Sequence, residues 1–536
     1  MSDSGNTLVV MTNTQEPQNI NISSVATAVD AVASAAADLK LYDTASHAVS
    51  NFTPIKPGQV GMYVCGATVQ GSPHIGHIRA AVAFDVVRRW FERLGYKVTF
   101  VRNVTDIDDK ILDKAAAAGQ QWWERAYIYE REFTEAYNTL GVEPPTYEPR
   151  ATGHMIDMID LIKQIIDNGH GYVVTDENGN PTGNVYFDVA SWPHYGELTH
   201  QKQTAVADAA SEVADAMGPS VDNAGNDKYN PVDPADMSED KHDPRDFALW
   251  KAPKDSDPLD ARWNTPFGTG RPGWHIECSV MSKKYLADEI DIHAGGEDLI
   301  FPHHENEIAQ SEAANGVPFS KYWMHNAFLN IDNKKMSKSL GNFFTVRDIS
   351  REYDLEVLRF FMLSAHYRNP VNFSHDLMES AKNGLDRILT AVDNLRHLSE
   401  NAKDVPMTED EKKIIASIDD IYKKFEDSMD DDFNTADAIS AIFELVKLAN
   451  SNSSSDNSKE YIDTLMKKIT TLTDILGLKT DKKEEMLDED IEALIAERQQ
   501  ARKDKNFARA DEIRDELLAK GIVLKDTREG VRWSRA

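Results

Sequence analysis

Apolar residues in the first half of the chain follow strand and helix periods in turn. An alternating, β-branched run at residues 59–65 predicts a strand that ends at Gly66. Apolar positions at helical spacing predict a helix over residues 75–94, and residues 97–101 predict a second strand. Three later apolar runs predict further buried strands, at residues 247–250, 289–293 and 323–329. This order of elements is typical of the α/β class.

From residue 346 onward the apolar period becomes helical. Four long amphipathic runs predict a helical bundle, at residues 381–398, 409–429, 435–449 and 460–476. A linker rich in Lys, Asp and Glu at residues 479–488 separates this bundle from a small terminal module. The last stretch, residues 498–536, carries eleven Lys and Arg against seven Asp and Glu, so the module is locally basic.

Two segments lack a sustained apolar period. Residues 1–38 are rich in Ser, Ala, Asn and Thr and hold no aromatic residue, so we expect a disordered tail there. Residues 201–240 hold many Asp, Ala, Ser and Asn residues and no Lys or Arg from 203 to 227. That composition predicts a flexible acidic surface insertion.

The composition and charge narrow the class of protein. The 536 residues are 41% hydrophobic and 27% charged, which suits several globular domains. We find neither a run of 18 apolar residues nor a signal peptide, and we expect a cytoplasmic protein with no membrane partner. The net charge of −31 disfavours loose binding to nucleic acid, because phosphates attract Lys and Arg. An RNA partner would have to be recognised through local basic patches and base contacts.

A turn with two histidines follows the first predicted strand. It runs from Cys65 to His77 and places His74 and His77 three residues apart, so both can face one ligand at the first turn of the helix. Glycines in the turn let the backbone approach a ligand closely, and a helix N-terminus favours phosphate oxygens. A capping or core role for either histidine is the alternative.

A second string, Lys-Met-Ser-Lys-Ser-Leu-Gly-Asn, lies far downstream at residues 335–342. Its lysines and serines beside a glycine suit a mobile loop that closes on a polyphosphate, because lysine neutralises charge that develops in phosphoryl transfer. A solvated charge run is the alternative. The two strings in this order resemble the signature pair of class I aminoacyl-tRNA synthetases, and the pair is more specific than either string alone.

The chain has two cysteines, Cys65 and Cys278. Two isolated cysteines are often small buried hydrophobes, and a disulfide is not expected in a reducing compartment. Here, however, histidines and carboxylates accompany them, and His303 and Glu307 stand four apart on one helix face. The four side chains offer two sulfurs, a nitrogen and an oxygen, which suits zinc better than magnesium or calcium.

A closed structural zinc site is the alternative to a functional one. The functional interpretation is favoured because Cys65 belongs to the same turn as His74 and His77. A metal held by Cys65 would therefore lie in the substrate cleft. A thiophilic cation at that place can take a substrate thiolate as a further ligand.

The strings around these residues resemble the cysteinyl-tRNA synthetase family over nearly the whole chain from Leu39 to Trp533, apart from the acidic insertion. The resemblance rests on the residues around Cys65 and on the strings 105–110, 274–278, 291–307 and 335–342. It implies that one Zn²⁺ per chain, bound by Cys65, Cys278, His303 and Glu307, contacts the side chain of cysteine. It implies catalytic roles for His74, His77, Lys335 and Lys338. It implies cofactor-binding roles for Gly76, Lys338, Thr68, Trp274, His293 and Asp298.

The resemblance also implies an architecture and a reaction. The fold would be α/β, with a Rossmann-like class I catalytic domain and its connective insertion at residues 39–345, a helical bundle at 346–478 and a small basic anticodon-recognition module at 486–536. The enzyme would activate L-cysteine with ATP and Mg²⁺ to cysteinyl-adenylate and transfer it to the 3′-terminal adenosine of tRNA(Cys). The family suggests a monomer. No editing domain is needed, because zinc–thiolate bonding rejects serine, which an apolar pocket cannot do.

Two rival functions remain open at this point. The related cysteine ligase of mycothiol synthesis shares the activation chemistry but resembles only the catalytic half, so the helical bundle and basic module favour a tRNA substrate. A non-catalytic RNA-binding scaffold is disfavoured by the presence of both signature strings. The chain departs from the family pattern at three positions near the expected pocket, Ala67, Gln70 and Ala294.

The roles of several supporting residues have two interpretations. Trp274 resembles an aromatic lid over the bound amino acid, but it could equally be core. Asp106, Asp108 and Asp109 could suggest a metal site, yet Thr105-Asp106 before a helix is more simply an N-cap. Trp533, between two arginines, either stacks on an unpaired base or packs on an apolar face. That face would consist of Ile513, Leu517 and Ile522.

Overall fold

The computed structural model describes residues 38–200, 238–331, 334–335, 344–480, 488–504, 506–520, 522–527 and 530–535. The expected disordered tail and most of the expected acidic insertion lie outside these ranges. The chain divides into two compact units, Met1–Lys479 and Thr480–Ala536. No helix within the described ranges is long and apolar enough to cross a membrane.

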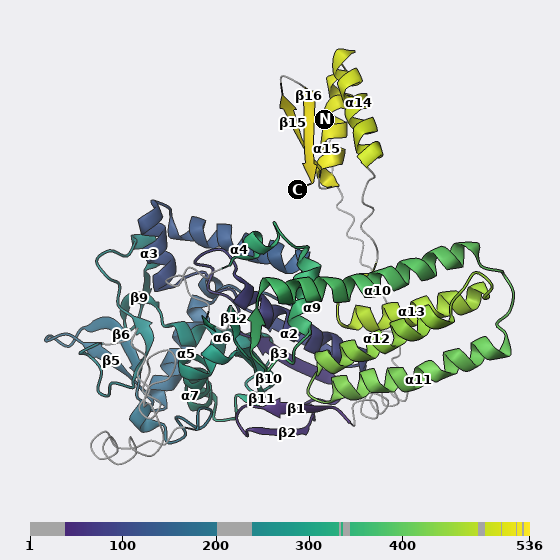
Figure 1. The fold of residues 1–536 in the computed structure, drawn as a ribbon. Coiled ribbons are helices and arrows are strands. Elements are labelled where there is room, and N and C mark those ends of the chain that lie inside the picture. The colour runs from purple at the N-terminus through teal and green to yellow at the C-terminus, as the bar shows by residue number, and fades with distance from the viewer. Residues whose placement is uncertain are drawn as a thin grey trace, which may run out of the picture. The chain divides into compact units, whose positions relative to one another are not determined.

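A four-stranded parallel sheet forms the centre of the first unit (Figure 1). Its strand order is β11-β10-β3-β4. The strands are β3 (Gln59–Val64), β4 (Lys97–Arg102), β10 (Ile290–Gly296) and β11 (Ser320–Asn326). The chain leaves β3 toward β4 on one side, while β10 lies on the other, so the carboxyl ends of β3 and β10 flank a topological switch point.

Helix α2 (Ile75–Arg93) connects β3 to β4, as the sequence predicts. Its apolar side chains, among them Ile78, Val82 and Phe84, are buried because they recur at helical spacing. Gly95, with a φ of 93°, then turns the chain toward β4 in a conformation that favours glycine. The strand, turn, helix and strand expected from the periodicity is therefore confirmed.

A long insertion separates β4 from β10. It contains the helices α3 (Asp109–Ala118), α4 (Trp122–Thr139), α5 (Met155–Asp167) and α6 (Trp274–Tyr285). It also contains a five-stranded antiparallel sheet of order β5-β6-β7-β9-β8. These strands are β5 (Gly171–Thr175), β6 (Pro181–Phe187), β7 (Phe247–Lys251), β8 (Trp263–Thr265) and β9 (Gly268–Pro272). Helix α7 (Glu305–Asn315) follows β10.

Two small sheets extend the centre of the first unit. The hairpin of β1 (Lys40–Asp43) and β2 (Ala48–Asn51) is antiparallel. The second small sheet has the order β13-β12-β14, with β12 (Leu329–Ile331), β13 (Lys334–Lys335) and β14 (Val371–Phe373). Strand β14 lies in the part expected to be helical, and it pairs in parallel with β12. Its three residues are too few to show a strand period.

Helices α8 (Val346–Ile349) and α9 (Leu355–Leu363) precede β14. The four predicted long helices follow, as α10 (His375–Asn401), α11 (Glu409–Asp430), α12 (Thr435–Asn452) and α13 (Lys459–Ile475). Figure 1 shows them side by side as a bundle. One contiguous hydrophobic core runs from Leu39 to Leu478, so packing continues across residue 345, where we expected a boundary.

The second unit contains α14 (Asp488–Lys503), α15 (Phe507–Ala519) and an antiparallel hairpin of β15 (Ile522–Thr527) and β16 (Gly530–Arg535). It has a small core of its own, made of Ile491, Ile495, Ile513, Leu517 and Ile522. Trp533 lies in β16 opposite Leu524. Its side chain is outside the described part of the structure, so both interpretations of Trp533 stay open.

Candidate metal and nucleotide site

Cys65 lies at the switch point of the parallel sheet. It follows β3 directly, and its backbone N–H donates to the carbonyl oxygen of Ala294 in β10 at 2.9 Å. This bond extends the pairing of the two strands beyond the end of β3. The Cys65 Sγ consequently lies 3.3 Å from Nε2 of His293, a fully buried residue of β10.

The four expected metal ligands converge beside this contact. Cys278 comes from α6, Glu307 from the first turn of α7, and His303 from the kinked turn Ile300–His304 that leads into α7. Glu307 Oε1 lies 2.9 Å from His303 Nε2 and 3.4 Å from Cys65 Sγ. Ligand atoms of all four residues lie within 4.8 Å of one another. The cluster is formed from three parts of the chain: the residue after β3, helix α6, and the turn Ile300–His304 with α7.

Neighbouring groups shift the protonation of this cluster. Burial would raise the pKa of Glu307, but His293 and His303 lower it to about 2. Burial would lower the pKa of His303, but Glu307 beside it raises that pKa to about 10. Burial raises the pKa of Cys65; it would also raise that of Cys278, which hydrogen bonding with Cys65 and His303 instead lowers to about 6. Without a metal, negative charge is thus favoured on Glu307 and Cys278 and positive charge on His303, so a metal would bind by displacing the protons of His303 and Cys65.

A second group of possible ligands overlaps the first. It consists of Cys65, His293, His304 and Glu307. His304 was not among the residues that we selected from the sequence. Its Nδ1 lies 2.7 Å from Nε2 of His325, whose Nδ1 lies 2.7 Å from the Thr44 hydroxyl. The adjacent pair His303-His304 is the signal that could have identified it.

Tyr63 is a further residue at the site that sequence reasoning missed. It is fully buried in β3, and its ring stacks on that of His293 at 5.2 Å between centroids. Burial, together with the charges of Cys278 and Cys65, raises the pKa of its hydroxyl. The alternation of a strand places Tyr63 and Cys65 on the same face, which is the signal that could have found it.

Trp274 and His275 begin α6 next to the cluster. The half-buried Trp274 ring stacks on His303 at 4.2 Å between centroids. Nδ1 of His275 lies 3.0 Å from Nδ1 of His303. Trp274 therefore borders the possible metal ligands and is not enclosed in the apolar core. The Lys110 ammonium lies 6.0 Å from the centre of the Trp274 ring.

The two signature histidines occupy the start of α2. His74 is the N-cap residue, and its backbone N–H donates to His77 Nδ1 at 3.2 Å. Their rings stack at 3.5 Å between centroids. Burial and the nearby His74 lower the pKa of His77, so that ring is neutral. Gly76 lies between them in the first helical turn, where backbone N–H groups can meet a phosphate.

The segment after the lysine string lies against the histidine turn. Ile75 N–H donates to the Phe344 carbonyl oxygen at 3.3 Å, and Val346 N–H donates to that of Pro73 at 3.0 Å. His74 and Thr345 form a β-bridge between these bonds. Residues 344–346 and 73–75 are therefore paired, so the segment that follows the lysine string lies at the N-terminus of α2.

The remaining candidate residues occupy several places around the cleft. Thr68 forms a bridge with Thr105 directly after β3. Asp298 is exposed in the 3-10 turn Glu297–Leu299 that follows β10. Lys335 ends β13, with its side chain outside the described part, and Lys338 lies outside the described residues.

The N-cap expected at Thr105-Asp106 is wrong. Asp108 is the N-cap of α3, because its carboxylate accepts from the Lys110 N–H at 2.8 Å. The Asp106 carboxylate instead accepts the backbone N–H and hydroxyl of Thr152. Two further residues of extended chain before the helix move the cap from Asp106 to Asp108.

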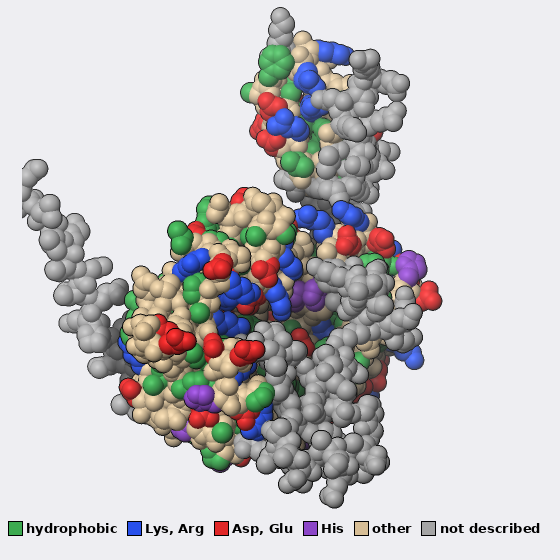
Figure 2. Space-filling model, turned by 90° about the vertical axis from the view of Figure 1, so that its left-hand side faces the viewer, with side chains coloured by type: hydrophobic (Ala, Val, Ile, Leu, Met, Phe, Trp, Pro, Cys, Tyr) green, Lys and Arg blue, Asp and Glu red, His purple; other side chains and the backbone are tan. Residues whose placement is uncertain are grey.

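Charges of both signs share the surface around these elements. On the face drawn in Figure 2, Lys and Arg side chains of the first unit are interspersed with Asp and Glu. Near α3, the exposed Lys254 and the buried Arg271 both contact Asp109.

Three family descriptions match the chain. They are the tRNA synthetases class I (C) catalytic domain at residues 51–383, the DALR domain at residues 424–480 and the cysteinyl-tRNA ligase anticodon binding domain at residues 484–533. The Cysteine--tRNA ligase of Lachnospira eligens is 69% identical over 93% of this chain and 100% of the relative. That of Bifidobacterium longum is 56% identical over 98% of this chain and 100% of the relative.

Solved structures with low identity share the fold. Methionyl-tRNA synthetase of Mycobacterium tuberculosis with methionyl-adenylate has a TM-score of 0.52 at 15% identity, over 78% of this chain and 89% of that chain. LeuRS of Agrobacterium radiobacter K84 with tRNA and LeuAMS has a TM-score of 0.55 at 12% identity, over 80% of this chain and 84% of that chain. These likenesses show the class I synthetase fold alone.

Proposed function

Since this chain belongs to the cysteine--tRNA ligase family, we propose that Cys65, Cys278, His303 and Glu307 hold one zinc ion that selects the substrate thiol. The enzyme is an ATP-dependent ligase that joins L-cysteine to tRNA(Cys). The observation that carries the zinc proposal is the convergence of four ligand atoms within 4.8 Å.

The donor atoms suit zinc in type and spacing. Zinc prefers thiolate and imidazole ligands, and tetrahedral bonds of about 2.0–2.3 Å put donors about 3.3–3.8 Å apart. The distances from Glu307 Oε1 to His303 Nε2 and to Cys65 Sγ are 2.9 and 3.4 Å. Small side-chain movements would bring these donors to that geometry. The overlapping group with His293 and His304 has one sulfur fewer and is the less suitable set for zinc.

Zinc in this cluster would supply a bond to sulfur that serine cannot make equally well. The protein's own residues would enclose the amino acid around it. Trp274 borders the cluster beside His303, and His293 closes the β10 side. We propose that both shape the pocket for a small side chain and exclude water.

ATP is proposed to bind along the N-terminus of α2. His74, Gly76 and Thr68 would contact the nucleotide with His77, because a helix start favours phosphate oxygens and the His77 ring is a neutral imidazole. Lys335 and Lys338 would stabilise charge that develops on the phosphates, together with Mg²⁺. Asp298, exposed in the turn after β10, would meet the nucleotide or amino acid from the carboxyl end of that strand.

The remaining proposals concern organisation and place of action. Residues 39–345 would form the catalytic domain, residues 346–478 the bundle and residues 486–536 the module that reads the anticodon. The family description at residues 484–533 supports the last assignment. We further propose that the enzyme acts in the cytoplasm as a monomer, as the resemblance to the family implies.

Elemental analysis combined with Cys278→Ser tests the zinc proposal. Purified enzyme should contain one zinc per chain, and Cys278→Ser should lose it together with cysteine binding, while ATP binding remains. Met281→Leu is the control, because Met281 is a fully buried residue of the same helix outside the ligand set. Cysteine-dependent pyrophosphate exchange and ATP titration give the two readouts.

Three outcomes would contradict this assignment. Active enzyme without zinc would remove the metal from the mechanism. Equal loss of cysteine and ATP binding in Cys278→Ser would identify a structural metal. Zinc lost in His304→Asn but kept in Cys278→Ser would make the overlapping group the ligand set.

A further inference from the structure

A groove of about 600 Å³ lies on the helical part of the first unit, away from the metal cluster. Helices α9, α10 and α12 and the start of β14 line it. Its apolar lining includes Phe360, Phe361, Leu377, Ile439 and Phe443. Leu377 is 45% exposed, whereas Phe360 and Phe361 are buried. Its volume is within the range of binding sites for ligands of nucleotide size.

Polar side chains occupy the rim of this groove. Ser364, Ser380, Asn383 and Ser440 are among the lining residues, and each carries groups that can bond a ligand edge. Such an apolar floor with a few polar groups is typical of a site for a planar molecule with polar edges.

Arg387 of α10 supplies a positive charge at the groove. Its guanidinium carbon lies 4.9 Å from the centre of the Phe443 ring. Within the described part of the chain Arg387 makes no hydrogen bond or ion pair. The protein has a net charge of −31, so carboxylates are abundant as partners for its arginines. Arg387 instead lies over an aromatic ring with no described carboxylate partner, which favours an anionic ligand at this place.

Gly384 lies one turn before Arg387 in α10. A Cβ atom at this position would be 3.0 Å from a ring atom of Phe360 and 3.5 Å from one of Phe443. Glycine is unfavourable inside a long helix. Its presence here leaves room between the two rings that line the groove.

We propose that this groove binds one unpaired nucleotide of the tRNA substrate. The base would lie against Phe443 in the groove, and a phosphate would contact Arg387. Proteins read RNA largely through bases that have left the helical stack, by stacking them on aromatic rings and arginine planes. The inference rests on the tRNA ligase function. It gives the first unit a contact with tRNA in addition to the contact proposed for the terminal module.

Two substitutions in the full-length enzyme test the groove. Ser440→Trp fills it from an exposed position, and Arg387→Gln removes the charge while keeping length. Each should raise the KM for tRNA(Cys) and the Kd of the enzyme–tRNA complex about five- to fiftyfold, the range of a lost stacking contact. Lys382→Gln removes the same charge from another exposed position of α10 and should change either constant less than twofold.

Cysteine-dependent pyrophosphate exchange separates this inference from the proposed function. Exchange and zinc content should be unchanged in both groove variants, because the groove lies outside the metal cluster. Unchanged exchange with KM and Kd for tRNA within twofold of wild type in both variants would overturn the groove as an RNA site. Wild-type enzyme that contains no zinc, or that does not catalyse cysteine-dependent pyrophosphate exchange, would instead contradict the proposed zinc mechanism.

Titration with AMP distinguishes a free nucleotide from one within RNA. The proposal expects AMP to leave the tRNA Kd unchanged at concentrations that saturate the catalytic cleft, since the other tRNA contacts hold the nucleotide in place. Competition by AMP that Ser440→Trp abolishes would show a free-nucleotide site and overturn the assignment to tRNA.

Discussion

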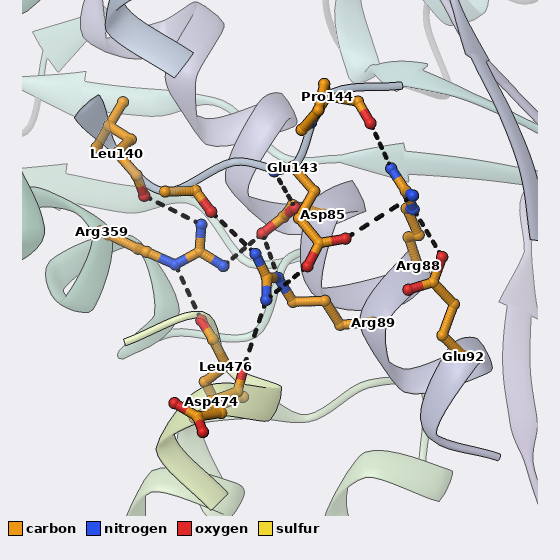
Figure 3. A network of polar contacts seen from close by, with 11 residues as sticks. Asp85, Arg88, Arg89, Glu92, Leu140, Glu143, Pro144, Arg359, Asp474 and Leu476 are labelled. Atoms are coloured by element: carbon orange, nitrogen blue, oxygen red, sulfur yellow. Dashed lines mark hydrogen bonds and ion pairs between the residues drawn. The ribbon is translucent and has the colours of Figure 1, made fainter. Parts of the chain in front are cut away.

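Arg359 and Asp85 form an ion pair in which both side chains are almost completely buried. Arg359 Nη2 donates to Asp85 Oδ2 at 2.6 Å, and the two side chains are 0% and 1% exposed (Figure 3). Arg359 also donates to the carbonyl oxygens of Leu476 and Leu140. The pair therefore joins α2, which starts with the signature histidines, to the ends of α4 and α13.

Removing one partner of this pair should destabilise the enzyme strongly. Asp85→Asn leaves the Arg359 charge buried without its carboxylate, and we expect the free energy of unfolding to fall by about 3–5 kcal/mol. Arg93→Gln in the same helix is the matched control. Its pair with Glu426 is long, at 3.9 Å, and 48% exposed on both sides, so we expect a loss below about 1 kcal/mol. Urea unfolding measures both; a similar loss in the two variants would contradict a special role for the buried pair.

Lys338→Ala should slow cysteinyl-adenylate formation by about 100-fold or more, because a cation that meets developing phosphate charge acts mainly in the transition state. The kcat and kcat/KM of pyrophosphate exchange should fall together. Lys334→Ala, outside the signature string, is the control and should retain most activity. A change confined to the KM for ATP would identify Lys338 as a ground-state contact.

Truncation after Thr480 should separate the two half-reactions. The second unit has its own core, so the first unit keeps its packing when the second is removed. Cysteine-dependent exchange should stay within about twofold, whereas kcat/KM for tRNA(Cys) should fall at least tenfold if unpaired bases stack on the missing module. Charging at the wild-type rate by the truncated enzyme would refute the anticodon assignment.

Asp430→Asn should stabilise the enzyme at alkaline pH. Burial and the charges of Asp38, Glu426 and Asp427 raise the pKa of Asp430 to about 6, although the Trp90 Nε1–H donates to its carboxylate. Above pH 6 the wild type must ionise this carboxyl in the folded state. Below about pH 3.9 it is protonated in both states, so the destabilisation grows between these values and is constant above them.

Because the Asp430 carboxyl is half-exposed, solvent screening limits the expected gain to about 1 kcal/mol at pH 8. The difference between variant and wild type should disappear as the pH falls to 4. Asp420→Asn at an exposed position of the same helix serves as control. Urea midpoints at pH 4.5, 6 and 8 measure the trend; a gain independent of pH would refute the titration of Asp430 as its cause.

Long periodic elements were predictable from the sequence, and short paired ones were not. The helix expected at residues 75–94 is α2 (Ile75–Arg93), because its apolar stripe faces one core along its whole length. Strand β14 was missed, because its three residues are defined by pairing with β12, which no local pattern records. The sheet of the insertion was only partly anticipated. Glycines such as Gly183 and Gly268, with φ of 97° and 107°, interrupt its strand period.

The cluster of possible metal ligands was predictable in composition but not in its surroundings. In the sequence, His and Glu residues accompany the two cysteines, Cys65 and Cys278. The structure brings the ligand atoms of both cysteines together with those of His303 and Glu307. The sequence could not tell which of two adjacent histidines faces the thiols. The kinked turn Ile300–His304 brings a ring nitrogen of each of them near Cys65. The backbone geometry of this turn depends on its packing against β10 and α6. The local sequence does not show that packing.

The distance along the chain between Cys65 and Glu307 has a consequence for synthesis. The two residues that meet at 3.4 Å are 242 positions apart, and His303 and Glu307 come last. A nascent chain exposes Cys65, and later Cys278, before His303 and Glu307 have been synthesised. During translation these thiols are ordinary reactive cysteines, open to oxidation or to stray metal. The buried environment of the cluster forms only when α7 has left the ribosome and packed against α6.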